Sequence, residues 1–262
     1  MHLLTSINPL YSLSGLVVGV LVGLTGVGGG SLMTPLLVLL FGIHPSTAVG
    51  TDLLYAAATK TVGTAVHGYK RTVQWSIVGR LAMGSVPTTA VTLWVLSQQG
   101  KQAATVNTLI TMALGWALIV TAVAILFRKA IVGYFLARTK QLEPGQAAGL
   151  TILLGAVLGV LVALTSVGAG ALGMTVLLIL YPKMDVAKLV GSDIAHAVPL
   201  TLIAGLGHWM MGTVNWQLLV SLLVGSIPGI ILGSLLAART PDGVLRPVLA
   251  GTLALVGGKL LT

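Results

Sequence analysis

Residues 19–30 read GVLVGLTGVGGG and residues 159–170 read GVLVALTSVGAG, so nine of twelve positions are identical at a spacing of 140 residues. In both stretches an apolar segment runs into a glycine-rich break, at 26–30 and at 166–170. Glycine permits sharp turns and close approach of other groups to the backbone. The sequence therefore predicts the same interrupted apolar hairpin in two places.

The match extends well beyond the two breaks. With one inserted residue the spacing becomes 141, and Asp52 then matches Asp193. At the same spacing, GSVP at 84–87 matches GSIP at 225–228. We interpret the chain as two homologous halves with a polar linker between them, divided as 1–127, 128–145 and 146–262.

The composition places these halves in a membrane. Of the 262 residues, 56% are hydrophobic and only 7% are charged, and the mean hydropathy is +1.02. Soluble domains carry about 25% charged residues. The composition excludes a soluble globular domain and predicts an all-α integral membrane protein. The chain has no cysteine, and therefore no disulfide and no thiolate metal site.

The lengths of the apolar stretches define the expected helices, since a spanning helix needs about 20 residues. Six stretches are long enough: 48–68, 75–97, 104–127, 186–211, 216–238 and 244–262. The other four form two pairs around the breaks, 10–25 with 31–41 and 146–164 with 170–181. The arm after each break is short, which favours turning back within the membrane over spanning as a kinked helix.

The distribution of basic residues indicates the topology. If each interrupted pair returns to the side from which it entered, each half has three further crossings and the two halves are inverted. Ten loop lysines and arginines then lie on one side and two on the other, as the positive-inside rule requires. If each pair crosses only once, the loops divide six against five and show no bias. We therefore expect both termini outside the cytoplasm and a basic cytoplasmic linker. The net charge of +9 is explained without nucleic acid.

The two breaks are candidate binding sites. Backbone that leaves the helix at membrane depth is tolerated only inside protein or around a polar cavity. Each short arm offers the positive end of a helix dipole, and two facing helix N-termini can hold an anion. Paired broken helices in inverted repeats are typical of secondary transporters. Close helix packing through small residues is the alternative explanation. The candidate ligands are Thr25, Gly28, Gly29, Gly30, Ser31, Thr165, Ser166, Gly168 and Gly170.

A few ionisable residues lie within the apolar stretches. Lys60 falls near the middle of its predicted helix, where a charge is costly and usually functional. It is a candidate anion ligand, or a lysine that reaches out to water. Asp52, Asp193 and His196 are candidates for carrying a coupling proton or sodium ion. The two aspartates could alternatively cap the first turn of their own helices.

Signatures of catalysis are missing from the sequence. It contains no H-E-x-x-H, G-x-S-x-G, Walker A or EF-hand pattern. We therefore expect no enzyme activity, no cofactor and no metal site. An intramembrane enzyme using Asp193 and His196 would lack a nucleophile. Since no ATP-binding domain is present, transport would be channel-like or driven by a gradient.

The glycine break, the VGTD segment at 49–52 and the GTVNW and GSIPG segments of the second half resemble the sulfite exporter TauE/SafE family. The resemblance covers nearly the whole chain. The second break departs from the pattern with Ala169, and the first half has Thr88 where the second half keeps glycine. The matching residues are Gly26, Gly28, Gly29, Gly30, Pro35, Gly50, Thr51, Asp52, Gly168, Gly170, Gly191, Ser192, Gly212, Trp216, Pro228 and Gly229.

The resemblance implies a transporter in the bacterial cytoplasmic membrane that exports small sulfur-containing anions, such as sulfite and organosulfonates including sulfoacetate. The residue analysis independently indicates an anion site between inverted broken-helix hairpins. Two alternatives remain open at this point: a passive anion channel of the same fold, and a membrane assembly protein that transports nothing.

Overall fold

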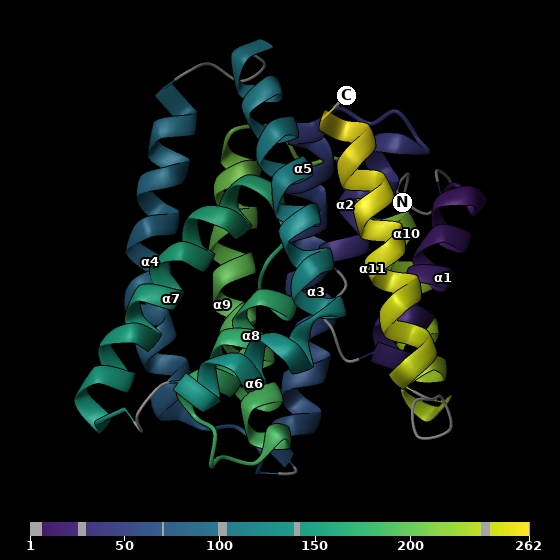
Figure 1. Cartoon of the computed structure of the whole chain (residues 1–262). Helices are drawn as coiled ribbons and strands as arrows, with labels where there is room; N and C mark the ends of the chain where they lie inside the picture. Colours follow the sequence, from purple (N-terminus) through teal and green to yellow (C-terminus); the bar gives the residue numbers. More distant parts are fainter. Residues whose placement is uncertain are drawn as a thin grey trace.

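The computed structural model describes residues 7–25, 30–69, 71–98, 104–138, 142–236 and 242–261. Across these ranges the chain is helical with short connections (Figure 1). The helices are α1 Pro9–Thr25, α2 Gly30–Leu39, α3 Pro45–Tyr69, α4 Trp75–Gln98, α5 Ala104–Leu126, α6 Arg128–Arg138, α7 Pro144–Thr165, α8 Ala171–Leu180, α9 Val186–Met210, α10 Trp216–Leu236 and α11 Asp242–Leu261.

The predicted all-α membrane architecture is confirmed, and the helix ends lie within three residues of the predicted stretches. The sequence did not predict α6, which occupies much of the 128–145 linker. Four helices in the described part of the chain are long and apolar enough to span a membrane, in α5, α7, α9 and α10. Although α3 has 25 residues, it is less apolar because it carries Asp52, Lys60 and several threonines.

Two helix pairs, α1 with α10 and α4 with α7, pack backbone to backbone. A Cβ atom added to Gly15 would lie 2.2 Å from the carbonyl oxygen of Leu222, and one added to Gly155 would lie 2.1 Å from that of Leu81. Such distances leave room for a hydrogen atom only. Gly15 and Gly155 are equivalent in the repeat register, and so are Leu222 and Leu81. Each pair joins one half of the chain to the other.

In both pairs the partner helix contributes a glycine to the contact in the same way. A Cβ atom on Gly84 would lie 1.9 Å from the carbonyl oxygen of Ile152. One on Gly225 would lie 1.7 Å from that of Ser12. We call the α1–α10 and α4–α7 contacts the two glycine seams. Because all four of these contacts cross between the halves, neither half contains the partner surface that these glycines require.

In each broken hairpin, a side chain of the first helix contacts the side chain of a residue near the end of the short arm. In the first hairpin the rings of Tyr11 and Phe41 meet edge to face, with centroids 4.9 Å apart. In the second, the hydroxyls of Thr151 and Tyr181 are 2.8 Å apart. These are again equivalent positions at a spacing of 140. The short arm α8 therefore ends beside the start of α7, so this hairpin returns to the end from which it began.

We call the end of each hairpin at which these side chains meet its mouth. The two mouths lie toward opposite ends of the bundle. In Figure 1 the start of α1 and the end of α11 lie in the upper part of the view, while α6 lies in the lower part. The mouth of the second hairpin is at the α6 end, because Leu136 of α6 lines a cavity together with Pro144 and Tyr181. The mouth of the first hairpin is near the start of α1.

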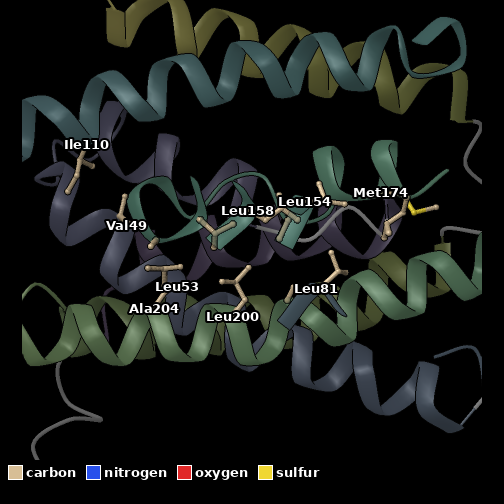
Figure 2. Packing of buried hydrophobic residues seen from close by; sticks show 14 of the residues in the cluster. Val49, Leu53, Leu81, Ile110, Leu154, Leu158, Met174, Leu200 and Ala204 are labelled. Atoms are coloured by element: carbon tan, nitrogen blue, oxygen red, sulfur yellow. The ribbon is translucent and has the colours of Figure 1, made fainter. Parts of the chain in front are cut away.

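The largest apolar core lies between the halves rather than within either one. Figure 2 shows side chains from several helices converging there. Leu53, Leu81 and Leu200, from α3, α4 and α9, are each at most 1% exposed. Leu158 of α7 and Met174 of α8 complete the contact, so the second broken hairpin is embedded in protein. Four of the five residues of the break at 166–170 are accordingly buried.

Candidate functional site

The second break has a backbone that only a glycine-rich sequence adopts easily. Helix α7 ends at Thr165, and Ser166 follows in the left-handed conformation with φ 59°. Gly168 and Gly170 have φ values of 121° and 110°, a region that residues with a Cβ rarely occupy. The carbonyl of Gly168 accepts hydrogen bonds from the N–H groups of Leu172 and Gly173, in the first turn of α8. The break is thus a defined reversal between two helices.

Two polar side chains hold the end of α7. The Thr165 hydroxyl donates to the carbonyl of Leu161 and accepts from the N–H of Val167. His208 of α9 lies with Nε2 2.9 Å from the carbonyl of Ala163, a group left unpaired where the helix stops. Both side chains are buried. In the described structure the Thr165 hydroxyl is therefore committed to the backbone of the break itself.

The contact between His208 and the Ala163 carbonyl at the break can be tested by mutation. Replacing His208 by phenylalanine leaves the Ala163 carbonyl buried without a donor, and such a loss costs about 1–3 kcal/mol. We expect a lower melting temperature in detergent for this variant. A histidine that only filled space would be replaced by phenylalanine with no change in melting temperature.

Each of the two aspartates lies at the start of a short arm rather than at the start of its own helix. Asp52 and Asp193 are each the eighth residue of α3 and α9, and neither helix has an acidic residue in its first turn. The interpretation of these residues as caps of their own helices is therefore wrong. Asp193 Oδ1 lies 2.6 Å from where a Cβ of Gly173 would be, in the first turn of α8, and the backbone N–H of Gly170 lies near the same carboxyl group.

The other carboxyl group meets the first hairpin in a related way. Asp52 Oδ2 accepts a hydrogen bond of 2.5 Å from the hydroxyl of Thr34 in α2. The hydroxyl of Ser166, in the second break, lies beside the same carboxyl group without forming a full hydrogen bond. Asp52 belongs to the first half and Ser166 to the second. The carboxyl group of Asp52 therefore connects the two hairpins.

The charge of Lys60 acts on both acidic groups. It is 7% exposed, and both Asp52 and Asp193 are close enough to attract its ammonium group. Its charge also acts on His196. Arg128, at the start of α6, adds a second positive charge that acts on Asp193. Two carboxyl groups and one lysine are therefore buried within range of one another's charge, and Arg128 acts on Asp193 from the start of α6.

The residue one helical turn after each aspartate approaches a serine of the opposite half. His196 Nε2 lies 2.9 Å from Ser85 Oγ. The hydroxyl of Tyr55 lies beside that of Ser226. Tyr55 and His196 are equivalent in the repeat register, and so are Ser226 and Ser85. The GS-x-P motifs thus supply a serine to the central polar cluster, and Tyr55 is the counterpart of the predicted His196.

Several polar atoms of this cluster are buried without a hydrogen-bond partner. They belong to the side chains already described and lie on both halves of the chain. Buried polar atoms are nearly always paired, so unpaired ones in one place indicate that a ligand, an ion or water completes the site. The unpaired atoms are Asp52 Oδ1, Asp193 Oδ1, His196 Nδ1, Ser166 Oγ and Tyr55 Oη.

The structure brings together the predicted residues Lys60, Asp52, Asp193, His196 and Ser166. Gly168 and Gly170 shape the adjoining turn. Gly30 begins α2. Gly28 and Gly29 lie outside the described residues, as do the side chains of Thr25 and Ser31. Sequence reasoning missed Thr34, Ser85, Tyr55 and Ser226. The repeated GS-x-P motif was a usable signal for the two serines, whereas nothing in the sequence singled out Thr34.

A buried polar cluster beside a broken helix, within an apolar helical bundle, is typical of membrane transporters. The model of the family "Sulfite exporter TauE/SafE" matches residues 11–260. The chain is 40% identical over 250 residues to "Probable membrane transporter protein YjnA" of Bacillus subtilis. That alignment covers 95% of this chain and 98% of the relative. It is 27% identical over 249 residues to "Probable membrane transporter protein YdhB" of the same organism, in an alignment that covers 93% of this chain and 96% of the relative.

A third relative, "Probable membrane transporter protein" of Xylella fastidiosa (strain Temecula1), is 27% identical over 239 residues, 86% of this chain and 83% of that protein. No solved structure matches. The protein is an integral membrane transporter and not an enzyme. The chain belongs to the sulfite exporter TauE/SafE family.

Proposed function

We propose that this protein is a secondary transporter that exports small sulfur-containing anions, such as sulfite or organosulfonates including sulfoacetate. The observation that carries the proposal is the central cluster, in which buried Lys60 is within range of carboxyl groups of both halves and neighbouring polar atoms have no partner. The proposed substrate ligands are the residues around the two breaks together with Lys60. The family name supports the choice of anion.

The charges of the cluster support coupling to a cation. The formal negative charges of Asp52 and Asp193 are at most offset by those of Lys60 and Arg128. A bound monoanion would add an uncompensated negative charge in a region of low dielectric constant, which is strongly unfavourable. A proton or sodium ion that neutralises one carboxylate removes this penalty. We therefore propose that one cation accompanies each monoanion, with Asp52, Asp193 and His196 as its carriers. Because both ions then move in the same direction, export runs down the outward gradient of the anion.

The same residues limit where the anion can bind. The N-terminus of α8 already faces the carboxyl group of Asp193. An anion reaches the Gly170 N–H and the helix dipole favourably only when that carboxyl group is neutral. Proton or sodium binding at Asp193 therefore prepares the anion site, which gives coupling a direct structural cause.

We also propose a topology for the chain. The two halves are related by inversion, both hairpins turn back within the bacterial cytoplasmic membrane, and both termini lie outside the cytoplasm. The hairpin mouths at opposite ends of the bundle support the inversion. The α6 end, which carries the basic linker, is then cytoplasmic. Alternating access would come from movement of the hairpins relative to each other.

Uptake by proteoliposomes tests the proposal. Labelled sulfoacetate and sulfite are offered with and without an imposed pH or sodium gradient. Accumulation that depends on a gradient is the expected result, with one cation for each singly charged bisulfite and two for each doubly charged sulfoacetate. Equilibration that ignores both gradients would identify a passive channel instead. No flux of either anion from folded protein would contradict the proposed function and leave a membrane assembly role.

Gly168 provides a test of the break itself. Replacing Gly168 by leucine places a side chain on a backbone with φ 121°, at a strain of about 1–3 kcal/mol. We expect transport to fall at least tenfold while the protein stays folded. Gly212, with φ 72° in a turn away from the site and open space around it, is the control, and its alanine variant should transport normally. Normal substrate binding by the Gly168 variant would remove the break from the proposed site.

A further inference from the structure

A second polar site lies at the α6 end of the bundle. It is a cavity of about 560 Å³ whose walls come from four parts of the chain: the start of α4, the end of α6, the start of α7 and the connection from α8 to α9. Its charged lining residues are Arg80, Lys183, Lys188 and Asp185, a formal excess of two positive charges. The volume is ample for a small organic anion and its water.

The side chain of Arg80 is held in this cavity by contacts with the fold. It is half-buried on α4, and its guanidinium Nη1 donates a hydrogen bond of 3.2 Å to the hydroxyl of Tyr181. That hydroxyl is in turn paired with Thr151, which closes the mouth of the second hairpin. A guanidinium group has five N–H donors and binds sulfonate- or phosphate-like oxygens well. Arg80 is thus oriented by the hairpin and lines the cavity.

The cavity adjoins the central cluster through backbone contacts. Gln74 lines the cavity, and its N–H donates to the hydroxyl of Ser192, the residue before Asp193. Helix α8 makes a second connection, because its last residues line the cavity while its first turn meets Asp193. A ten-residue helix is about 15 Å long, so the two sites are separated by about that distance.

We propose that this cavity is an entry site that recruits the substrate oxyanion from the cytoplasmic side, with Arg80 and Lys188 as its anion contacts. This inference rests on the proposed function for the identity of the substrate. Positive charge in a recessed site concentrates anions and raises their rate of association, in a way that weakens with salt. An oxyanion held at Arg80 is also beside the mouth of the hairpin that must move to admit it.

The test uses the full-length protein in proteoliposomes of known orientation. The double variant Arg80→Gln with Lys188→Gln is compared with Lys129→Gln with Arg138→Gln, which removes the same charge from α6 outside the cavity. Sulfoacetate and sulfite are offered separately to each face. The expected result is a KM about tenfold higher at the α6 face only, with Vmax unchanged and with less dependence on salt. An unchanged KM, or a lower Vmax with unchanged KM, would overturn the proposal.

An anionic lipid headgroup offers similar oxygens, and a second arm distinguishes it. Melting temperatures are measured in neutral and phosphatidylglycerol nanodiscs. If anionic lipid stabilises the protein through Arg80 and Lys188 while KM is unchanged, the cavity holds a headgroup and the proposal is overturned.

A third arm separates the entry site from the proposed function. The central cluster is neutralised by Lys60→Met, Asp52→Asn and Asp193→Asn, and the protein is titrated with sulfoacetate in neutral nanodiscs. A thermal shift that is lost on adding Arg80→Gln supports the entry site even if the unaltered protein carries no sulfur anion. Absence of that shift would overturn the entry site, whatever the transport assay shows.

Discussion

Replacing Lys60 by methionine is expected to reduce anion transport at least a hundredfold and to destabilise the protein. The methionine fills a similar volume but leaves Asp52 and Asp193 without the positive charge that acts on both of them. Removing one partner from a buried charged group typically costs about 3–5 kcal/mol. We expect the loss to appear as a lower melting temperature and as lower yield of folded protein.

Because poor folding alone would abolish transport, a compensated variant separates the two effects. Adding Asp52→Asn and Asp193→Asn to the methionine variant removes the unpaired charges and should restore the melting temperature. Transport should stay absent, since neither the cationic contact nor the titratable groups remain. Lys129→Met, at an exposed position of α6, is the control and should behave like the unaltered protein. Transport by the compensated variant would show that the central charges have no part in the mechanism.

The glycine seams should be at least as sensitive. In Gly84→Leu and Gly225→Leu, the first side-chain carbon alone would lie 1.9 Å and 1.7 Å from a backbone carbonyl oxygen. Neither backbone can yield without separating the helices, so the penalty exceeds the 1–3 kcal/mol typical of overpacked cores. We expect no folded, monodisperse protein from either variant, measured by fluorescence-detected size-exclusion chromatography.

Other glycines of the same helices provide the control for this experiment. Gly79 of α4 and Gly149 of α7 have open space where a Cβ would lie. Their alanine variants should fold normally, with a stability gain of up to about 1 kcal/mol from the better helix propensity of alanine. If Gly84→Leu folded as well as Gly79→Ala, the seam would not be the close contact described here.

Much of the fold follows from the sequence because hydropathy and glycine breaks act locally. A spanning helix satisfies its own backbone, so its ends can be read from the apolar stretch that contains them. This is why α9 and α10 were predicted within two residues. Helix α6 was missed because its apolar run, 130–137, is too short to span a membrane and is bounded by Arg128, Lys129 and Arg138.

The site is harder to predict from the sequence because its contacts join helices that are far apart along the chain. Asp52 and Asp193 were predicted as functional candidates, yet their relation to α2 and α8 depends on how those arms fold back. The hydrogen bond from Thr34 to Asp52 and the approach of Ser85 to His196 join different helices. No local pattern encodes such pairs. The repeat could have exposed them, since Ser85 with His196 and Ser226 with Tyr55 occupy equivalent positions.

The glycine seams also determine the order in which the newly made chain can assemble. Leu81 and Gly155 are 74 residues apart, whereas Gly15 and Leu222 are 207 residues apart. Helix α1 therefore enters the bilayer long before its partner α10 has been synthesised, and its bare glycine face must meanwhile rest against lipid or other helices. The α4–α7 seam completes early and the α1–α10 seam almost last. A ribosome that stalls before residue 216 leaves α1 without its partner, a defect that membrane quality control can detect.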